Sequence, residues 1–227
     1  MRRLIRIIGR LLVAWIVLSV GAVVVYRFVD PPFTPLMAIR VVQSMAAGER
    51  VEVHKQWVDL DRISPALVRA VIAGEDARFF LHHGIDLGAV DAAREHNERH
   101  PRRLHGASTI TMQCARNVYL WPGRTWLRKE LEAWFTVLLE AVWGKTRILE
   151  VYLNVAEWGR SVYGVEEAAR RAFGVDAAAL TPEQAALLAA VLPAPRRLDP
   201  ASPSAYVRAR AATIARRAEG VSLPLPR

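Results

Sequence analysis

The pattern of hydrophobic and polar positions begins with one long uncharged run. Residues 11–26, LLVAWIVLSVGAVVVY, lie between Arg10 and Arg27 and contain no charged side chain. As a helix this run spans about 24 Å. Flanking apolar residues and snorkelling arginines extend the length toward the ~30 Å of a bilayer core. The run therefore predicts a transmembrane anchor over residues 11–29.

The residues before the anchor indicate its orientation. Residues 1–10 carry four arginines, and an excess of arginine next to a membrane span marks its cytoplasmic side. We expect a cytoplasmic basic stub at residues 1–10, with the rest of the chain outside the cytoplasm. A cleaved signal peptide is the alternative, but no small-x-small cleavage site follows the run.

After the anchor the pattern changes to a proline-rich connector and then to helices. The prolines of DPPFTP (30–35) predict a stiff connector, which opens a linker and membrane-proximal segment over residues 30–60. Within it, VEVHKQWVDL (51–60) could pair as a short strand. From residue 61 to 227 helical spacing dominates, so we expect one mainly α domain. Its helices are predicted to follow Ser64–Pro65, to cover 125–143, 145–154 and 165–173, and to start at Thr181, where Gln184 completes a capping box.

Two segments of this domain carry more specific predictions. In residues 125–143, helical spacing predicts one buried apolar stripe made of Leu127, Leu131, Trp134, Leu138 and Val142. Residues 94–106, REHNERHPRRLHG, are charged and lack apolar periodicity, so we expect a mobile loop. A nucleic-acid patch is the alternative for these arginines and histidines, and we favour a solvated connector.

Charge and cysteine content limit the partners. The formal net charge is +9 and the isoelectric point is near 10.5, which favours anionic partners such as nucleic acid, anionic lipid or a phosphorylated substrate. The predicted topology excludes nucleic acid, since the basic domain lies outside the cytoplasm. Cys114 is the only cysteine, which excludes an internal disulfide and a metal site built from thiolates.

Glu75 is the first candidate for proton transfer. In VIAGEDARFFLHHGID (71–86) an acidic pair directly follows an apolar run. If the helix continues past this pair, Glu75, Phe79 and His82 share one face until Gly84 ends it. Burial would raise the pKa of the Glu75 carboxyl and suit it to proton transfer. A surface acid at a helix end is the alternative, and this segment alone favours it.

Two further segments carry polar residues suited to an anion. GASTITMQCARNVYL (106–120) predicts a helix start capped by Ser108, and a helix N-terminus followed by Arg116 is a candidate phosphate cradle. Ordinary capping with a polar outer face is the alternative. In WLRKELE (126–132), Arg128 and Glu132 stand at i and i+4, where they form either a surface ion pair or a polar cluster at the border of the core. Each signal is weak alone, whereas their order and spacing are specific.

Together these segments resemble the peptidoglycan glycosyltransferases in their monofunctional biosynthetic form. Five motifs occur in the family's order over residues 64–175: E-D-x-x-F-x-x-H-x-G at 75–84, G-A-S-T-I-T-x-Q at 106–113, R-K-x-x-E at 128–132, K-x-x-I-L-E-x-Y-L-N at 145–154 and G-V-x-x-A-A at 164–169. The chain departs from the family where Met112 replaces a glutamine, Arg116 a lysine, Ala172 a tyrosine and Val175 a lysine. The transpeptidase motifs S-x-x-K and K-T-G are missing from the sequence, so polymerisation without cross-linking is expected.

The resemblance implies a lysozyme-like domain with a jaw partly embedded in the bacterial inner membrane and a periplasmic catalytic face. The implied substrate is lipid II, a disaccharide-pentapeptide on undecaprenyl pyrophosphate. The other implied partners are the growing glycan strand, membrane lipids, and cell-wall synthesis or division proteins. Glu75 is the implied general base, and Glu132 is the implied catalytic carboxylate of the donor side. A divalent cation such as Mg²⁺ or Mn²⁺ would help to neutralise the pyrophosphate, without a dedicated metal site. The implied substrate-binding residues are Asp76, Phe79, His82, Ser108, Thr109, Gln113, Arg116, Asn117, Arg128 and Lys129.

Two alternative functions remain open from the sequence. A lysozyme-like hydrolase would also use two carboxylates, although it has no pyrophosphate for the basic cluster to neutralise. A non-catalytic, membrane-tethered partner in a division or elongation complex is compatible with the departures at Met112, Ala172 and Val175. Glycan products that lengthen, shorten or stay unchanged distinguish these three functions.

Overall fold

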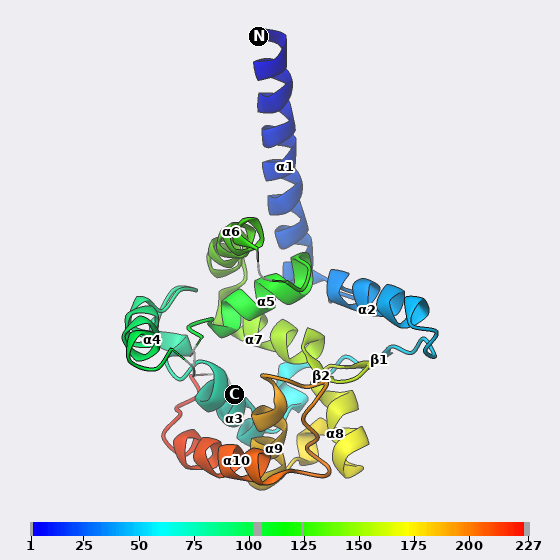
Figure 1. Cartoon of the computed structure of the whole chain (residues 1–227), viewed down its shortest axis with the longest axis vertical. Helices are drawn as coiled ribbons and strands as arrows, with labels where there is room; N and C mark the ends of the chain where they lie inside the picture. The colour runs from blue at the N-terminus through cyan, green and yellow to red at the C-terminus, as the bar shows by residue number, and fades with distance from the viewer. Residues whose placement is uncertain (1, 102–105, 124, 225–227) are drawn as a thin grey trace.

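A computed structural model describes residues 2–101, 106–123 and 125–224 of the chain, and helices dominate them (Figure 1). This confirms the mainly α prediction. One small sheet joins β1 (His54–Lys55), β3 (Val162–Tyr163) and β2 (Glu157–Gly159) in that order. The α-helices are α1 (Arg2–Phe28), α2 (Pro35–Ala46), α3 (Pro65–Glu75), α4 (Leu87–Arg99), α5 (Ile110–Tyr119), α6 (Trp126–Val142), α7 (Gly144–Val155), α8 (Val165–Phe173), α9 (Pro182–Val191) and α10 (Ala205–Ala218).

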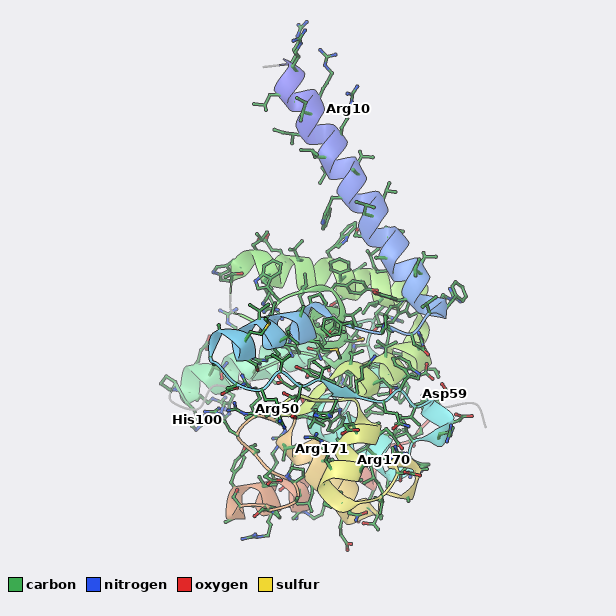
Figure 2. The ribbon with its side chains drawn as sticks, turned by 90° about the vertical axis from the view of Figure 1, so that its right-hand side faces the viewer. Arg10, Arg50, Asp59, His100, Arg170 and Arg171 are labelled. Atoms are coloured by element: carbon green, nitrogen blue, oxygen red, sulfur yellow. The ribbon has the colours of Figure 1, made fainter. Side chains whose placement is uncertain are left out.

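Helix α1 projects from the body of the molecule as a long apolar rod (Figure 1). Within the described residues it alone is long and apolar enough to cross a membrane. Figure 2 shows Arg10 on the projecting part of this helix, away from the rest of the chain. The structure therefore fits a single-pass anchor, and the helix extends beyond the predicted residues 11–29 to begin at Arg2.

The last turns of α1 are held against α6 and α7 by hydrogen bonds. The indole N–H of Trp143 donates to the Val23 carbonyl at 2.7 Å. Arg147 donates to the carbonyl of Tyr26 at 3.0 Å, near the end of the helix, where carbonyls lack partners within the helix itself. These contacts fix the direction of the anchor relative to the domain.

The predicted linker contains one helix that the sequence reasoning missed. Pro35 occupies the first turn of α2 instead of extending the proline connector, and Thr34 caps this helix by accepting from the Met37 N–H at 3.4 Å. The predicted strand in residues 51–60 is present as β1, which pairs in parallel with β3. The linker thus returns to the domain and joins its sheet.

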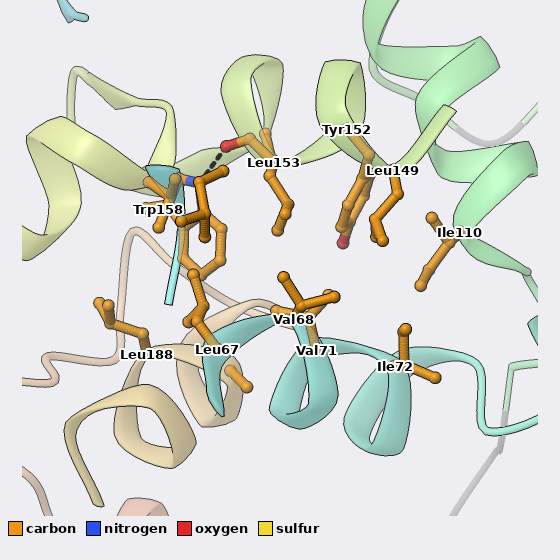
Figure 3. Close-up of a cluster of buried hydrophobic side chains, with 14 of the residues drawn as sticks. Leu67, Val68, Val71, Ile72, Ile110, Leu149, Tyr152, Leu153, Trp158 and Leu188 are labelled. Carbon is orange, nitrogen blue, oxygen red and sulfur yellow. Dashed lines mark hydrogen bonds between the residues drawn. The ribbon is translucent and has the colours of Figure 1, made fainter. Parts of the chain in front are cut away.

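The core forms where α3, α5, α7 and α9 meet. Figure 3 shows Val71 and Ile72 of α3 facing Leu149 of α7 and Ile110 of α5, and each of the four side chains is at most 1% exposed. Burying one such side chain contributes about 1.5–3 kcal/mol. This packing also brings the C-terminal end of α3, where Glu75 lies, next to α5.

Several predicted helix starts are confirmed. Helix α3 begins at Pro65, directly after Ser64, although the Ser64 hydroxyl donates to the Leu180 carbonyl at 2.9 Å instead of capping the helix. Helix α9 begins after Thr181, and the predicted capping box with Gln184 is complete. These starts were predictable because a proline in the first turn and a capping box both involve residues only a few positions apart.

The predicted loop at 94–106 is wrong for residues 94–99, which belong to α4. Asp86 caps this helix by accepting from the Ala89 N–H at 3.0 Å, and Arg94 pairs with Glu98 at i, i+4. All residues of α4 are described, and none of them is fully buried. Because no face of this helix is fully buried, its sequence lacks the apolar periodicity from which a helix is predicted. Residues 102–105 of the predicted loop lie outside the described residues.

The predicted stripe of α6 is only partly buried, because Leu131, Trp134, Leu138 and Val142 are half-buried and pack against the core. Leu127 is 60% exposed, and Trp134 of the same stripe lies beside Trp15 of α1, with ring centroids 5.3 Å apart. Trp134 of the stripe thus contacts α1, and a neighbouring face of α6 that includes polar residues is the more deeply buried one. The fully buried side chains of α6 are Arg128, Glu132, Phe135, Thr136 and Leu139.

Candidate active site

Glu75 is the last residue of α3, because the chain leaves helical geometry at Asp76, with φ −161° and ψ 75°. The prediction that Glu75, Phe79 and His82 share one helical face is therefore wrong. Phe79 instead begins a short 3₁₀ turn over Phe79–Leu81, and His82 has an extended backbone after it. Glu75 is thus presented at a helix end rather than on a helix flank.

Asp76 and His82 hold this turn in place. His82 Nε2 lies 2.9 Å from Asp76 Oδ1, and Asp76 Oδ2 accepts from the backbone N–H of Ile110 at 3.0 Å. Both side chains are at most 8% exposed. Asp76 therefore ties the end of α3 to the start of α5, which fixes where Gln113 lies relative to Glu75.

Gln113 and Tyr152 orient the Glu75 carboxyl. The Gln113 amide donates to Glu75 Oε2 at 2.9 Å, and the Tyr152 hydroxyl donates to Gln113 Oε1 at 3.1 Å. Because the amide oxygen accepts from Tyr152, the amide nitrogen must face Glu75. Burial raises the pKa of the Tyr152 hydroxyl well above its usual value, and the nearby Glu75 raises it further. The tyrosine thus stays protonated as the donor.

Glu75 combines burial with cationic neighbours. Its side chain is 11% exposed. Burial raises the pKa of the Glu75 carboxyl, while the Gln113 hydrogen bond and the charges of Arg210 and Arg116 oppose this rise in part. A buried carboxyl with a raised pKa, held by a hydrogen-bond donor and near two cations, suits a general base. The alternative that Glu75 is a solvated surface acid at a helix end is therefore excluded.

Arg210 is a site residue that the sequence reasoning missed. It extends from α10, and its Nη2 lies 3.3 Å from Glu75 Oε1. The motifs that carry the resemblance end near residue 175, so they do not include α10. A signal was available, because the buried side chains of this helix are Val207, Ala211 and Ile214, and residue 210 falls within that apolar spacing. An arginine on an apolar stripe indicates a buried partner.

A second polar cluster surrounds Glu132 on α6. The Glu132 carboxylate is 1% exposed and accepts from both Arg128 and Lys129. Arg128 is itself buried, and its Nε has no hydrogen-bond partner among the described residues. The i, i+4 pair is therefore a buried cluster and not a surface ion pair. Arg128 also lines the neighbouring cleft, and a guanidinium has more N–H donors than one carboxylate uses, so this arginine is suited to a further anion.

A cleft of about 640 Å³ lies between Glu132's cluster and the Glu75 site. Gln113 and Tyr152, which orient Glu75, both line it. Arg40 of α2 also lines it, although the sequence reasoning missed this residue because it precedes the motifs; its Nη2 donates to Glu157 Oε2 at 3.2 Å. The predicted residues that line the cleft are Ser108, Gln113, Arg116, Asn117 and Arg128.

Other predicted binding residues are buried behind the cleft. Phe79 is fully buried, and the ammonium of Lys145 lies 4.5 Å from its ring centroid. Thr109, and not the predicted Ser108, caps α5 by accepting from the Met112 N–H at 3.1 Å. The Ser108 prediction was wrong because adjacent hydroxyls are equally good caps and only the backbone geometry selects one. Asp76 and His82 likewise support the site from behind.

The carboxylates near the site already have partners. Ligand atoms of Asp76, His82 and Asp86 lie within 4.8 Å of one another, but Asp76 accepts from His82 and Ile110, and Asp86 accepts from Ala89. Glu132 similarly accepts from two cationic side chains. A divalent cation does not fit either group without displacing these donors.

Comparison with known proteins agrees with this geometry. The transglycosylase family model matches residues 41–219. The chain is 57% identical over 215 residues to a biosynthetic peptidoglycan transglycosylase of Rhodospirillum centenum, covering 95% of this chain and 90% of that protein. It is 52% identical over 213 residues to one of Pseudomonas putida, covering 94% and 90%, and 50% identical over 207 residues to one of Xanthomonas axonopodis pathovar citri, covering 91% and 84%. The chain belongs to the transglycosylase family and is a glycosyltransferase.

Proposed function

We propose that this transglycosylase acts in peptidoglycan synthesis and polymerises lipid II into linear glycan strands. The observation that carries the proposal is a buried carboxyl of raised pKa, Glu75, beside a cleft lined by Arg40, Arg116 and Arg128. A base next to a cationic cleft suits a reaction that removes a proton from one substrate and expels a pyrophosphate from the other. A hydrolase that cleaves glycan has no use for the cationic side.

In the proposed reaction Glu75 takes the proton from the 4-hydroxyl of the acceptor's GlcNAc. The hydroxyl oxygen then forms a bond to the anomeric carbon of the donor's MurNAc. The bond from that carbon to the undecaprenyl pyrophosphate breaks with inversion, and the electron pair leaves with the pyrophosphate. Gln113 holds the carboxylate of Glu75 toward the cleft during this transfer.

Cationic side chains would stabilise the departing pyrophosphate. Arg116 and Arg128 line the cleft, and Lys129 shares Glu132 with Arg128. Glu132 would then hold the two cations in position rather than transfer a proton. The three cations supply the neutralisation, so no step of the proposed mechanism runs through a divalent cation, and a stimulation by Mg²⁺ or Mn²⁺ stays a prediction.

The proposed location follows from the anchor. Arginines precede the apolar part of α1, which supports a cytoplasmic N-terminus and a periplasmic domain at the inner membrane. We take residues 1–10 as the cytoplasmic stub, 11–29 as the span, 30–60 as the membrane-proximal segment and 61–227 as the glycosyltransferase domain. Polymerisation without cross-linking is supported by the missing transpeptidase motifs, and cell-wall synthesis or division proteins are the proposed partners.

The test is polymerisation of labelled lipid II by the full-length protein in detergent, with products resolved by length. Glu75→Gln keeps the shape of the side chain and removes the base, so we expect polymerisation to fall by about 10²–10⁴-fold. Glu183→Gln, at an exposed position of α9, is the matched control and should behave as wild type. Near-normal turnover by Glu75→Gln would contradict the role of Glu75. Shorter products would indicate a hydrolase, and lipid II bound but unchanged by wild type would indicate a non-catalytic partner.

A further inference from the structure

A second hollow lies next to the catalytic cleft. It has a volume of about 590 Å³ and is formed by the β2–β3 hairpin, α8, the end of α9 and residues 195–201. Pro195 lines both the hollow and the cleft. Arg196, on the side of the hollow, lies 3.8 Å from the carboxylate of Glu157, which lines the cleft. The two depressions are therefore neighbours that share Pro195 as a lining residue.

The rim of this hollow is rich in arginine. Asp199 is its only acidic lining residue among those described, and its carboxylate accepts from the Ala201 N–H at 2.8 Å. Figure 2 shows Arg171 at the surface of α8. The side chain of Arg197 forms no hydrogen bond or ion pair with any residue in the described part of the chain. The arginines of the rim are Arg160, Arg171, Arg196 and Arg197.

The partners of these arginines leave their guanidinium groups accessible. Arg171 pairs with Glu167 at 3.0 Å and its side chain is 43% exposed. Arg160 pairs with Glu49 at 3.0 Å and is 61% exposed. Each guanidinium has five N–H donors in a planar fork that matches a carboxylate, so one internal ion pair does not exhaust it.

The floor of the hollow is apolar and exposes little aromatic surface. Val162, Ala168 and Leu188 line it and are buried. Trp158 also lines it, but its side chain is almost fully buried, at 2% exposure, and its indole N–H donates to the Leu153 carbonyl (Figure 3). Little aromatic face is therefore available for stacking against a sugar ring. An aliphatic floor below a rim of arginines suits a short peptide with small apolar side chains and carboxylates.

We propose that this arginine-rimmed hollow binds the carboxylate-bearing peptide of the substrate while the sugars occupy the cleft. The proposal rests on the proposed function, because the peptide is the one carried by lipid II and by the growing strand. Guanidinium groups of Arg171 and Arg197 bind the peptide carboxylates, and the aliphatic floor receives the small side chains. The position of the hollow beside the cleft, with Pro195 lining both, favours a peptide attached to the sugars over an acidic segment of a separate protein.

The test compares two double variants of the full-length protein in detergent. Arg171→Gln with Arg197→Gln removes two charges from the hollow. Arg216→Gln with Arg217→Gln removes two charges from exposed positions of α10 and is the matched control. The probes are a soluble disaccharide-pentapeptide, the same molecule with its carboxylates amidated, and the disaccharide without peptide, each titrated by calorimetry.

We expect the hollow variant to bind the free-carboxylate probe about tenfold more weakly than wild type. The control variant should bind it as wild type does, and binding of the other two probes should not differ between variants. In polymerisation assays the hollow variant should raise KM for lipid II and leave kcat unchanged, because the peptide is distant from the bond that forms. Equal melting temperatures establish that both variants fold.

Two results would overturn the proposal. One is equal binding of the free-carboxylate probe by the hollow and control variants. The occupant of the hollow would then be an acidic segment of a separate protein and not the peptide of the substrate. The other is an equal loss for the probe that lacks the peptide, which would make the effect one of general charge. Failure of the proposed function is seen separately, as absence of polymer from wild type, since the binding experiment needs no turnover.

Discussion

Replacing Arg210 by methionine removes the ion pair of the proposed base while keeping a long side chain on α10. Arg210 Nη2 lies 3.3 Å from Glu75 Oε1 and the arginine side chain is 28% exposed. Its charge lowers the pKa of the Glu75 carboxyl, against the larger effect of burial. Without that charge the pKa must rise further. A general base acts when ionised, so the acidic limb of the pH–rate profile should move to higher pH.

The size of the shift follows from the geometry. Two unit charges 3.3 Å apart interact by about 5 kcal/mol at an effective dielectric of about 20, which is an upper limit here. Solvent reaches Arg210, and the charge of Arg116 and the Gln113 hydrogen bond remain in the variant. We therefore expect a shift of about one pH unit, or ~1.4 kcal/mol. Tyr152, which also interacts with Glu75, is unchanged in the variant.

The assay is kcat/KM for lipid II polymerisation as a function of pH, which reports the base in the unliganded enzyme. On the acidic limb, at pH values where the base is largely protonated in both proteins, Arg210→Met should be about tenfold slower than wild type. On the plateau at higher pH the two rates should converge. Arg210→Lys keeps the charge and should shift the limb by much less. Arg208→Met is the control on the same helix, because the Arg208 side chain donates to the Pro203 carbonyl and not to Glu75.

A loss of rate that is equal at every pH would refute the electrostatic reasoning. It would indicate that Arg210 positions α10 or the substrate and does not act on the protonation of Glu75. An acidic limb that moves to lower pH would refute the sign of the interaction itself. Thermal unfolding of each variant separates either outcome from a folding defect.

Two further perturbations test the framework around the site. Gly84 has φ +85°, and a Cβ there would meet Thr136 Cγ2 at 2.7 Å, whereas Gly174 has φ +69° and open space around it. Gly84→Ala should therefore lower the free energy of unfolding by about 1–3 kcal/mol more than Gly174→Ala, measured by urea denaturation. Equal losses in the two variants would contradict the steric argument. Removal of residues 1–30 leaves the Trp143 indole without the Val23 carbonyl and removes the membrane anchor. Polymerisation activity should therefore fall further on lipid vesicles than in detergent. Equal losses in both would mean that the anchor serves folding alone.

The sequence by itself determined the features that depend on neighbouring residues. The anchor followed from one uncharged run, the start of α3 from Pro65 in its first turn, and the start of α9 from the capping box at Thr181. The positions of Glu75, Gln113 and the Arg128–Glu132 cluster were identified by motifs, whose spacing can be counted along the chain. Each of these features is encoded in one contiguous stretch of the chain, namely an apolar run, a helix start or a short motif.

The tertiary structure alone decided which groups meet. Glu75 and Arg210 are 135 positions apart in the sequence, and no local pattern encodes their contact. The end of α3 was misjudged because Asp76 leaves the helix to bind the Ile110 N–H on α5. The burial of α6 was misjudged in part, because Arg128 and Glu132 pair with each other in buried positions that an apolar stripe does not reveal. A sequence shows which side chains need burial or a partner; only the packed chain determines which long-range partner each obtains, because that depends on all elements at once.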